Sequence, residues 1–283
     1  MVQILNLRDL QMIERVHARG GRFRYYPLLA GQEGAPGNFF LQLSNTFDDF
    51  ASPRHRHNFD QVRIQLQGDA DFARDGVMRP GTIGYFPEGV FYGPQTIAGE
   101  SLTLVLQFGG ASGSGYLSEA AFQRGIAELK QKGRFEGGIY KVDKPEGGTR
   151  NQDAYEAVWE HVNGRRLRYP EGEGAQAPAF LQPEDFPWQP SPGEPGVERR
   201  LLGRFSSAQT ALSVLRLAAG ASASLSPNAV LFVMKGSGDV TTGEDKPPQG
   251  DWERYSSIYT GDSAVRLVAW TESEVVQVRL PQL

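Results

Sequence analysis

Short apolar segments, each closed by glycine, proline or aspartate, recur through the first half of this chain and limit it to few folds. They lie at residues 38–44, 61–67, 82–86 and 101–108. Runs of this length between turn-forming residues are typical of β-strands. The 34 glycines and 18 prolines, with 11% aromatic residues, suit an all-β protein with many turns better than a helical bundle. We therefore expect an all-β fold.

The apolar period changes after residue 110, where two helices are expected. Ser118 can cap the first helix and Gly133 can end it, with apolar residues on one face between them. Asn151 can cap the second helix, which stops before Gly164. Seven prolines between residues 165 and 198 disfavour both helices and central strands, so that segment is expected to be an extended, Pro-rich connector.

Strand-like segments return in the last third of the chain, which predicts a second β-domain. They lie at residues 211–217, 230–234, 265–270 and 275–280. The expected organisation is an N-terminal barrel over residues 1–110, a helical insert and connector over 111–198, and a C-terminal barrel over 199–283.

Charge and cysteine content exclude several functional classes. The formal net charge is −4, and no basic stripe suited to a phosphate backbone is present, so we expect no nucleic-acid partner. The chain has no cysteine, which excludes disulfides, thiolate nucleophiles and cysteine-bound zinc. No apolar run has the length of a membrane span or the form of a signal peptide, so no membrane association and a cytoplasmic location are expected.

Two of the four histidines occur within three residues, in the stretch Arg-His-Arg-His-Asn-Phe-Asp-Gln that ends at Gln61. On an unbroken strand His55, His57 and Gln61 would point to the same face. Two imidazoles and an amide oxygen suit a transition metal better than calcium or magnesium. Arg63 continues the face of Gln61, and its guanidinium can pair with a carboxylate, which favours an anionic small substrate. A structural ion pair, or a bulge that reverses the parity, is an equal alternative for Arg63.

These residues and a second stretch resemble the paired motifs of the cupins. His55, His57 and Gly68 match the first motif, while Gly81, Pro87 and Gly89 match the second. The resemblance covers about residues 38–110. It implies a jelly-roll barrel in which the two motifs meet. Two positions depart from the pattern, because Gln61 replaces the usual glutamate and Tyr92 replaces the final histidine.

The C-terminal domain resembles a degenerate second cupin. Alignment of Gly236 on Gly68 places Ala223, Leu225 and Ala229 at the ligand positions, and none of these can bind a metal. The expected fold is therefore two cupin jelly-roll barrels with a small helical insert and a Pro-rich connector, and a metal site only in the first barrel.

The resemblance implies a metal-dependent enzyme, and a dioxygenase-type oxidoreductase acting on a small anionic or phenolic compound is the first hypothesis. His55, His57, Gln61 and Tyr92 would hold one divalent transition metal (Fe, Mn, Ni or Zn), and Tyr92 and Arg63 would act on the substrate. A turn carboxylate, Glu88, could serve as acid or base but is more often only solvated. A homodimer is implied as well. The alternative is a non-catalytic cupin that binds a small molecule, such as a sugar or an organic acid, without metal chemistry.

Overall fold

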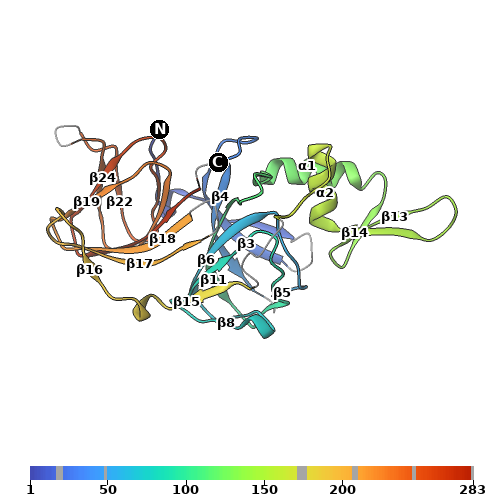
Figure 1. Ribbon diagram of the computed structural model, residues 1–283, viewed down its shortest axis with the longest axis horizontal. Helices are drawn as coiled ribbons and strands as arrows, with labels where there is room; N and C mark the ends of the chain where they lie inside the picture. Colours follow the sequence, from blue (N-terminus) through green and yellow to red (C-terminus); the bar gives the residue numbers. More distant parts are fainter. Residues whose placement is uncertain (17–21, 48–49, 171–176, 206–209, 244–246, 282–283) are drawn as a thin grey trace. The chain divides into compact units, whose positions relative to one another are not determined.

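The computed structural model describes residues 1–16, 22–47, 50–170, 177–205, 210–243 and 247–281. The chain forms two compact units, which we name the N-terminal unit (residues 12–25 and 30–180) and the C-terminal unit (residues 1–11, 26–29 and 181–283). Most elements are strands, and the described residues hold two α-helices (Figure 1). The all-β class expected from the sequence is confirmed. The domain limits expected at residues 110 and 198 stay predictions.

The N-terminal unit contains two main sheets. The larger has the order β15-β9-β6-β11-β4-β3-β2 and the smaller has the order β5-β10-β7-β8. The strands are β2 (Ile13–Val16), β3 (Arg22–Ala30), β4 (Phe39–Thr46), β5 (Phe50–Ser52), β6 (Phe59–Gln67), β7 (Ala70–Asp71), β8 (Val77–Met78), β9 (Ile83–Phe86), β10 (Gln95–Ile97), β11 (Ser101–Gly109) and β15 (Ala179–Leu181). A one-turn 3-10 helix, η2 (Ala73–Asp75), lies between β7 and β8.

The two sheets do not close into a barrel, which corrects the barrel expected from the sequence. An apolar cluster joins them on one side, with Phe50, Met78 and Ile97 from the smaller sheet and Phe86 from the larger. Sheets that pack in this way bury one face of each strand. The interior of this unit therefore lies between two sheets.

The pairing register of the strands places several polar side chains on the inner face of the larger sheet. Gln61 and Arg63 of β6 lie opposite Gln107 and Val105 of β11, and Val105 in turn lies opposite Gln42 of β4. Because side chains alternate along each strand, these paired residues share one face. The inner face is thus rich in amides, whereas Leu41 and similar residues of the opposite parity are buried and apolar.

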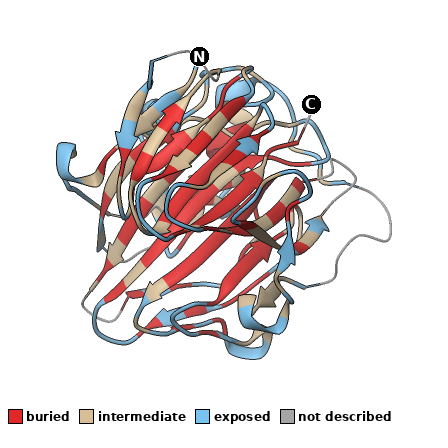
Figure 2. Ribbon diagram, turned by 90° about the vertical axis from the view of Figure 1, so that its left-hand side faces the viewer, coloured by how far each residue is buried: buried red, intermediate tan, exposed pale blue. Residues whose placement is uncertain are grey.

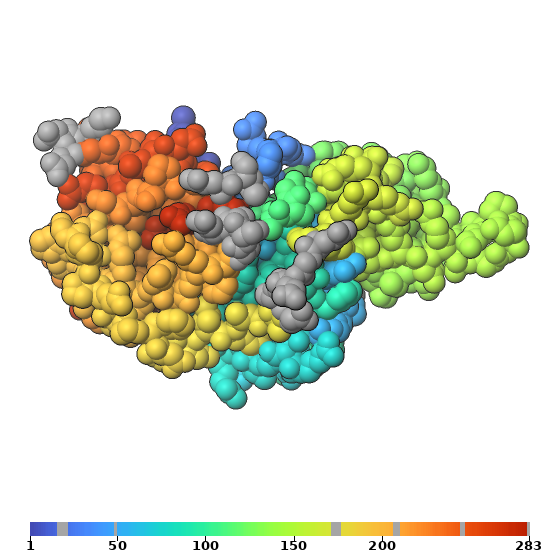
Figure 3. Space-filling view, viewed as in Figure 1, coloured from blue at the N-terminus to red at the C-terminus, as the bar shows by residue number. Residues whose placement is uncertain are grey.

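The helical insert follows β11. Helix α1 (Glu119–Leu129) begins after Ser118, whose hydroxyl accepts a hydrogen bond from the backbone N–H of Ala121, as expected. Helix α2 (Ala154–Asn163) is capped by Asp153 and not by Asn151, because strand β14 continues through Asn151 to Asp153 and the helix starts at the next residue. A three-stranded sheet of β12 (Arg134–Glu136), β13 (Ile139–Asp143) and β14 (Thr149–Asp153) completes the insert, and its hairpin extends away from the helices (light green in Figure 3).

The C-terminal unit also has two sheets, with the orders β1-β23-β20-β25-β18-β17-β16 and β19-β24-β21-β22. The strands are β1 (Gln3–Leu5), β16 (Gln189–Pro190), β17 (Val197–Phe205), β18 (Thr210–Leu217), β19 (Ser222–Leu225), β20 (Ala229–Lys235), β21 (Gly238–Thr241), β22 (Gly250–Trp252), β23 (Ser257–Tyr259), β24 (Val265–Ala269) and β25 (Ser273–Arg279). Two 3-10 helices, η1 (Leu7–Asp9) and η3 (Pro183–Asp185), also belong to this unit. Long stretches of buried residues follow the strands in Figure 2.

The interior of the C-terminal unit is a packed apolar core. Ala223, Leu225 and Ala229, which align with the ligand positions of the first motif, are almost fully buried in this core. Apolar side chains surround these three positions, so the interior there is closely packed.

The connector is more regular than its prolines predict. It contributes β15, η3 and β16, and β17 already begins at Val197. Pro190 sits in the edge strand β16, where the missing N–H of proline is tolerated. Among the described residues, no helix has the length and apolar character needed to cross a membrane.

Candidate metal centre and ligand cavity

The two motif segments are joined by main-chain hydrogen bonds. The N–H of His55 donates to the carbonyl of Tyr92 (3.1 Å), and the N–H of Tyr92 donates to the carbonyl of His55 (2.9 Å). The N–H of Gly89, in the turn before Tyr92, donates to the carbonyl of His57 (2.8 Å). Gly89 has a φ of +77°, which glycine adopts without strain. The turn therefore holds Tyr92 against the histidine pair.

Both imidazoles meet the Tyr92 hydroxyl in the interior. His55 Nε2 lies 3.0 Å and His57 Nδ1 lies 3.1 Å from the phenolic oxygen. The three side chains are 2–8% exposed. His55 Nδ1 lies 2.6 Å from the carbonyl oxygen of Pro53, and because a carbonyl can only accept, Nδ1 carries a proton; in the neutral imidazole this leaves the lone pair on Nε2.

The expected reason for this convergence is wrong in one respect. The strand β6 begins at Phe59, so His55 and His57 precede it and do not share an unbroken strand with Gln61. Their side chains meet through the bridge between His55 and Tyr92 instead of through strand alternation.

Arg63 lies inward with Gln61, on the same face of β6. Its Nε donates to Gln61 Oε1 (2.6 Å), one Nη donates to Gln95 Oε1 (2.8 Å), and the other donates to the Tyr92 hydroxyl (3.2 Å). The guanidinium carbon also lies 4.7 Å from the centre of the Phe86 ring. Gln61, Arg63 and Tyr92 thus form one hydrogen-bonded group with the two histidines.

The charge of Arg63 is not compensated by a carboxylate of the described residues. Its described hydrogen-bond partners are two amides and a phenol. Arg63 is buried, with only 9% of the residue exposed. Burial lowers the pKa of Arg63 below its ordinary value, and the nearby Tyr92 opposes this effect. An unpaired buried cation is unfavourable, so this position favours a bound anion.

Two adjoining cavities lie beside these residues in the N-terminal unit. The chamber that contains the motif residues, of about 100 Å³, is lined by His55, Gln61, Arg63 and Gln95 among others, and we name it the inner chamber for these residues. The outer chamber, of about 130 Å³, is lined mainly by aromatic side chains and by the ion pair of Arg15 with Glu119. Phe23, Gln42, His57 and Gln107 line both chambers. His57 therefore lies at their junction.

Glu88 is buried and hydrogen-bonded, not solvated as expected for a turn carboxylate. Its carboxylate accepts hydrogen bonds from the backbone N–H and the hydroxyl of Ser112. Asp60 accepts from the backbone N–H of Glu88 (2.8 Å) and from the Tyr85 hydroxyl (2.6 Å). Burial raises the pKa of Asp60 to about 6 and that of Glu88 to about 7. Neither carboxylate lines the two chambers, so both anchor the turn that carries Tyr92.

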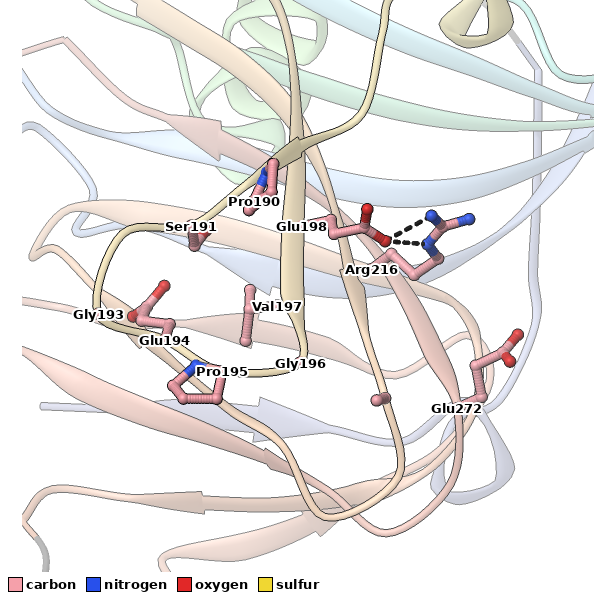
Figure 4. A pocket seen from close by; sticks show the side chains of 11 residues that line it. Pro190, Ser191, Gly193, Glu194, Pro195, Gly196, Val197, Glu198, Arg216 and Glu272 are labelled. Atoms are coloured by element: carbon pink, nitrogen blue, oxygen red, sulfur yellow. Dashed lines mark hydrogen bonds and ion pairs between the residues drawn. The ribbon is translucent and has the colours of Figure 1, made fainter.

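A surface pocket of about 500 Å³ lies in the C-terminal unit, around Pro190 and Glu198 (Figure 4). Arg216 Nε donates to Glu198 Oε2 (2.9 Å), so the two charges compensate each other. The pocket is widely open and contains no motif residue, which disfavours it as the functional site.

Sequence comparisons give no family, because no family model and no curated protein matches the chain. Solved structures do match its fold. Streptomyces albus HEPD, solved with 2-hydroxyethylphosphonate and Fe(II), is 13% identical, with a TM-score of 0.58 over 99% of this chain and 76% of that chain. Oxalate decarboxylase from Bacillus subtilis is 12% identical, with a TM-score of 0.54 over 98% and 76%. The E. coli protein Ylba is 9% identical, with a TM-score of 0.57 over 100% and 92%. The chain thus has a two-domain cupin fold, which confirms the expected resemblance at the level of the fold.

Several residues of the cavity were not identified from the sequence. Gln95 lies on β10 of the smaller sheet, and Tyr155 lies on α2 of the insert. Neither belongs to a motif, and only the packing of their elements brings them to the site. Gln95 follows the second motif by a few residues, which is the one local signal that could have suggested it.

Proposed function

We propose that the N-terminal unit is a metal-dependent enzyme whose substrate is a small anion. The observation that carries this proposal is the meeting of two imidazoles and one phenol in a buried cavity. Two donors bound at right angles to one ion, each about 2.1 Å away, lie about 3 Å apart. The separations of 3.0 and 3.1 Å around the Tyr92 oxygen fit that arrangement.

His55, His57 and Tyr92 would hold the ion, and Gln61 would be a fourth ligand. The amide oxygen of Gln61 accepts one hydrogen bond from Arg63 and keeps a second lone pair. The carbonyl of Pro53 fixes the tautomer and ring orientation of His55, as outer hydrogen bonds commonly do for ligating histidines. A bound Fe, Mn, Ni or Zn ion supplies Lewis acidity, and Fe or Mn also supplies redox chemistry.

Arg63 would bind the substrate. A divalent ion beside a guanidinium leaves the cavity with excess positive charge, which an anionic substrate reduces. Arg63 offers parallel N–H donors to a carboxylate or a phosphonate, and these hydrogen bonds would orient the substrate against Tyr92. More specifically, we propose that the reaction is that of a dioxygenase. This proposal predicts that metal-loaded protein consumes oxygen in an oxygen electrode when small organic acids are added.

A non-catalytic binding protein is the second candidate, and one observation favours it. Among the described residues no group of three or more His, Cys, Asp or Glu side chains is placed to hold a metal. In addition, the amide oxygen of Gln61 already accepts a hydrogen bond from Arg63, which competes with metal binding for its electron density. In this alternative the same cavity binds a sugar or an organic acid without a metal.

Metal analysis by plasma mass spectrometry on the untagged protein, expressed in metal-replete medium, distinguishes the two candidates. We expect close to one transition-metal ion per chain in the wild type and none after His55→Ala/His57→Ala. The matched control is His161→Ala, because His161 lies on helix α2 against Glu128, away from the cavity. A wild-type protein without metal would refute the enzyme proposal. The homodimer and the cellular location expected from the sequence stay predictions.

A further inference from the structure

The two chambers are lined by different kinds of side chain, and this difference indicates which kind of ligand the cavity can bind. The inner chamber presents the guanidinium of Arg63, amides and hydroxyls. Thr46 Oγ1 and Ser52 Oγ, which line it, are buried and have no hydrogen-bond partner among the described residues. Buried polar atoms of this kind are normally satisfied by a ligand or by water. The inner chamber is therefore suited to a small charged, oxygen-rich group.

The outer chamber is suited to an aromatic ring. Phe59 and Tyr155 meet edge to face at 5.7 Å, and Phe122 stacks on Tyr155 at 5.5 Å. Aromatic walls prefer an aromatic guest through offset and edge-to-face contacts. A dry cavity of about 150 Å³ is known to accommodate benzene. The outer chamber, at about 130 Å³, is close to that size.

The charges decide which chamber holds the anionic end of a ligand. Arg15 of the outer chamber is paired with Glu119, and both side chains are about one-third exposed. Arg63 of the inner chamber has no such partner among the described residues and is almost fully buried. An anion therefore gains more by pairing with Arg63 than with Arg15.

We propose that the ligand is an aryl acid, a single aromatic ring joined by a short link to a carboxylate or a similar anion. The anion pairs with Arg63 in the inner chamber, and the ring lies in the outer chamber against the aromatic wall that Phe59, Tyr155 and Phe122 form. His57 lines both chambers, so it lies beside the link. This inference rests on the proposed function only for the location of the site.

Calorimetric titration of the full chain tests the inference with three probes. Phenylacetate carries both the ring and the anion, acetate carries only the anion, and benzyl alcohol carries only the ring. We expect phenylacetate to bind at least about tenfold more tightly than either of the others. The titrations are made on chelator-treated protein, so that binding is read without turnover, and are repeated on metal-loaded protein.

Three arginine variants and one aromatic variant complete the test. Arg63→Gln should weaken phenylacetate binding at least about tenfold and leave benzyl alcohol unchanged. The matched control Arg15→Gln should change phenylacetate binding less than threefold. Phe122→Ala should reduce the preference for phenylacetate over acetate. If Arg63→Gln does not fold, Arg63→Lys keeps the charge but loses the parallel donors, and it should still weaken phenylacetate binding.

The inference is overturned if acetate binds as tightly as phenylacetate, if Arg15→Gln is as harmful as Arg63→Gln, or if phenylacetate does not bind at millimolar concentration. Its failure differs from failure of the enzyme proposal. Metal without phenylacetate binding refutes the aryl acid alone, whereas phenylacetate binding without metal refutes the enzyme alone.

Discussion

Removal of the Tyr92 hydroxyl should destabilise the N-terminal unit far more than an ordinary loss of one hydrogen bond. The hydroxyl contacts three groups, namely His55 Nε2, His57 Nδ1 and an Nη of Arg63, at 3.0, 3.1 and 3.2 Å. A phenol has one donor and two acceptor sites, so all three contacts can be hydrogen bonds at once. Tyr92 is only 2% exposed, so water does not replace them readily.

The expected magnitude follows from the partners. A neutral hydrogen bond contributes about 1 kcal/mol and one to a charged group about 2 kcal/mol. Tyr92→Phe should therefore lower the free energy of unfolding by about 3 to 4 kcal/mol. Tyr140→Phe is the matched control in the same unit, because that buried hydroxyl donates to a single neutral acceptor, the carbonyl of Leu129 (3.0 Å). It should lose about 1 kcal/mol.

Equilibrium unfolding in urea, followed by tryptophan fluorescence on chelator-treated protein, measures both variants. Metal is removed so that the result reports only the hydrogen bonds of the chain. A loss for Tyr92→Phe no larger than that for Tyr140→Phe would refute the view that this hydroxyl joins the two imidazoles and the guanidinium.

Three further results are expected from the same unit. The raised pKa values of Asp60 and Glu88 mean that the folded protein holds protons more tightly than the unfolded chain between about pH 4 and pH 7. The free energy of unfolding should therefore fall as pH rises through this window, by up to ~1.4 kcal/mol per pH unit for each group, and Glu88→Gln should flatten the profile in urea titrations. Gly68→Ala should lower the thermal midpoint much more than Gly34→Ala. A Cβ at Gly68 would lie 2.6 Å from the carbonyl oxygen of Glu100, whereas a Cβ at Gly34 would face open space. Equal effects of the two substitutions would contradict this reasoning. Asp153→Ala removes the cap of α2 and should destabilise the fold by about 1 kcal/mol in the same assay, while an unchanged stability would exclude a capping role.

The sequence predicted the elements better than it predicted their contacts. The first helix began at the expected cap, because Ser118 acts on its own first turn. The cap of the second helix was misplaced by two residues, since β14 pairs with β13 as far as Asp153 and the helix starts only after the strand ends. Tertiary pairing of this kind overrides a local preference, and it cannot be read from a short window of sequence.

For the candidate site, too, some features were predicted from the sequence and others were not. The motif residues His55, His57, Gly81, Pro87 and Gly89 resemble the cupin motifs, and that resemblance implied the fold. The alternation along one strand placed Arg63 with Gln61, and this inference follows from local geometry, because the period of a strand depends only on neighbouring residues.

Only the tertiary structure decided what surrounds those residues. It brought the Tyr92 hydroxyl between both imidazoles, left the guanidinium of Arg63 among neutral partners, and set Tyr155 of the insert against Phe59 of the sheet. It also filled the second unit with apolar side chains. These outcomes depend on register and packing between segments far apart in the chain, and no local pattern of residues encodes them.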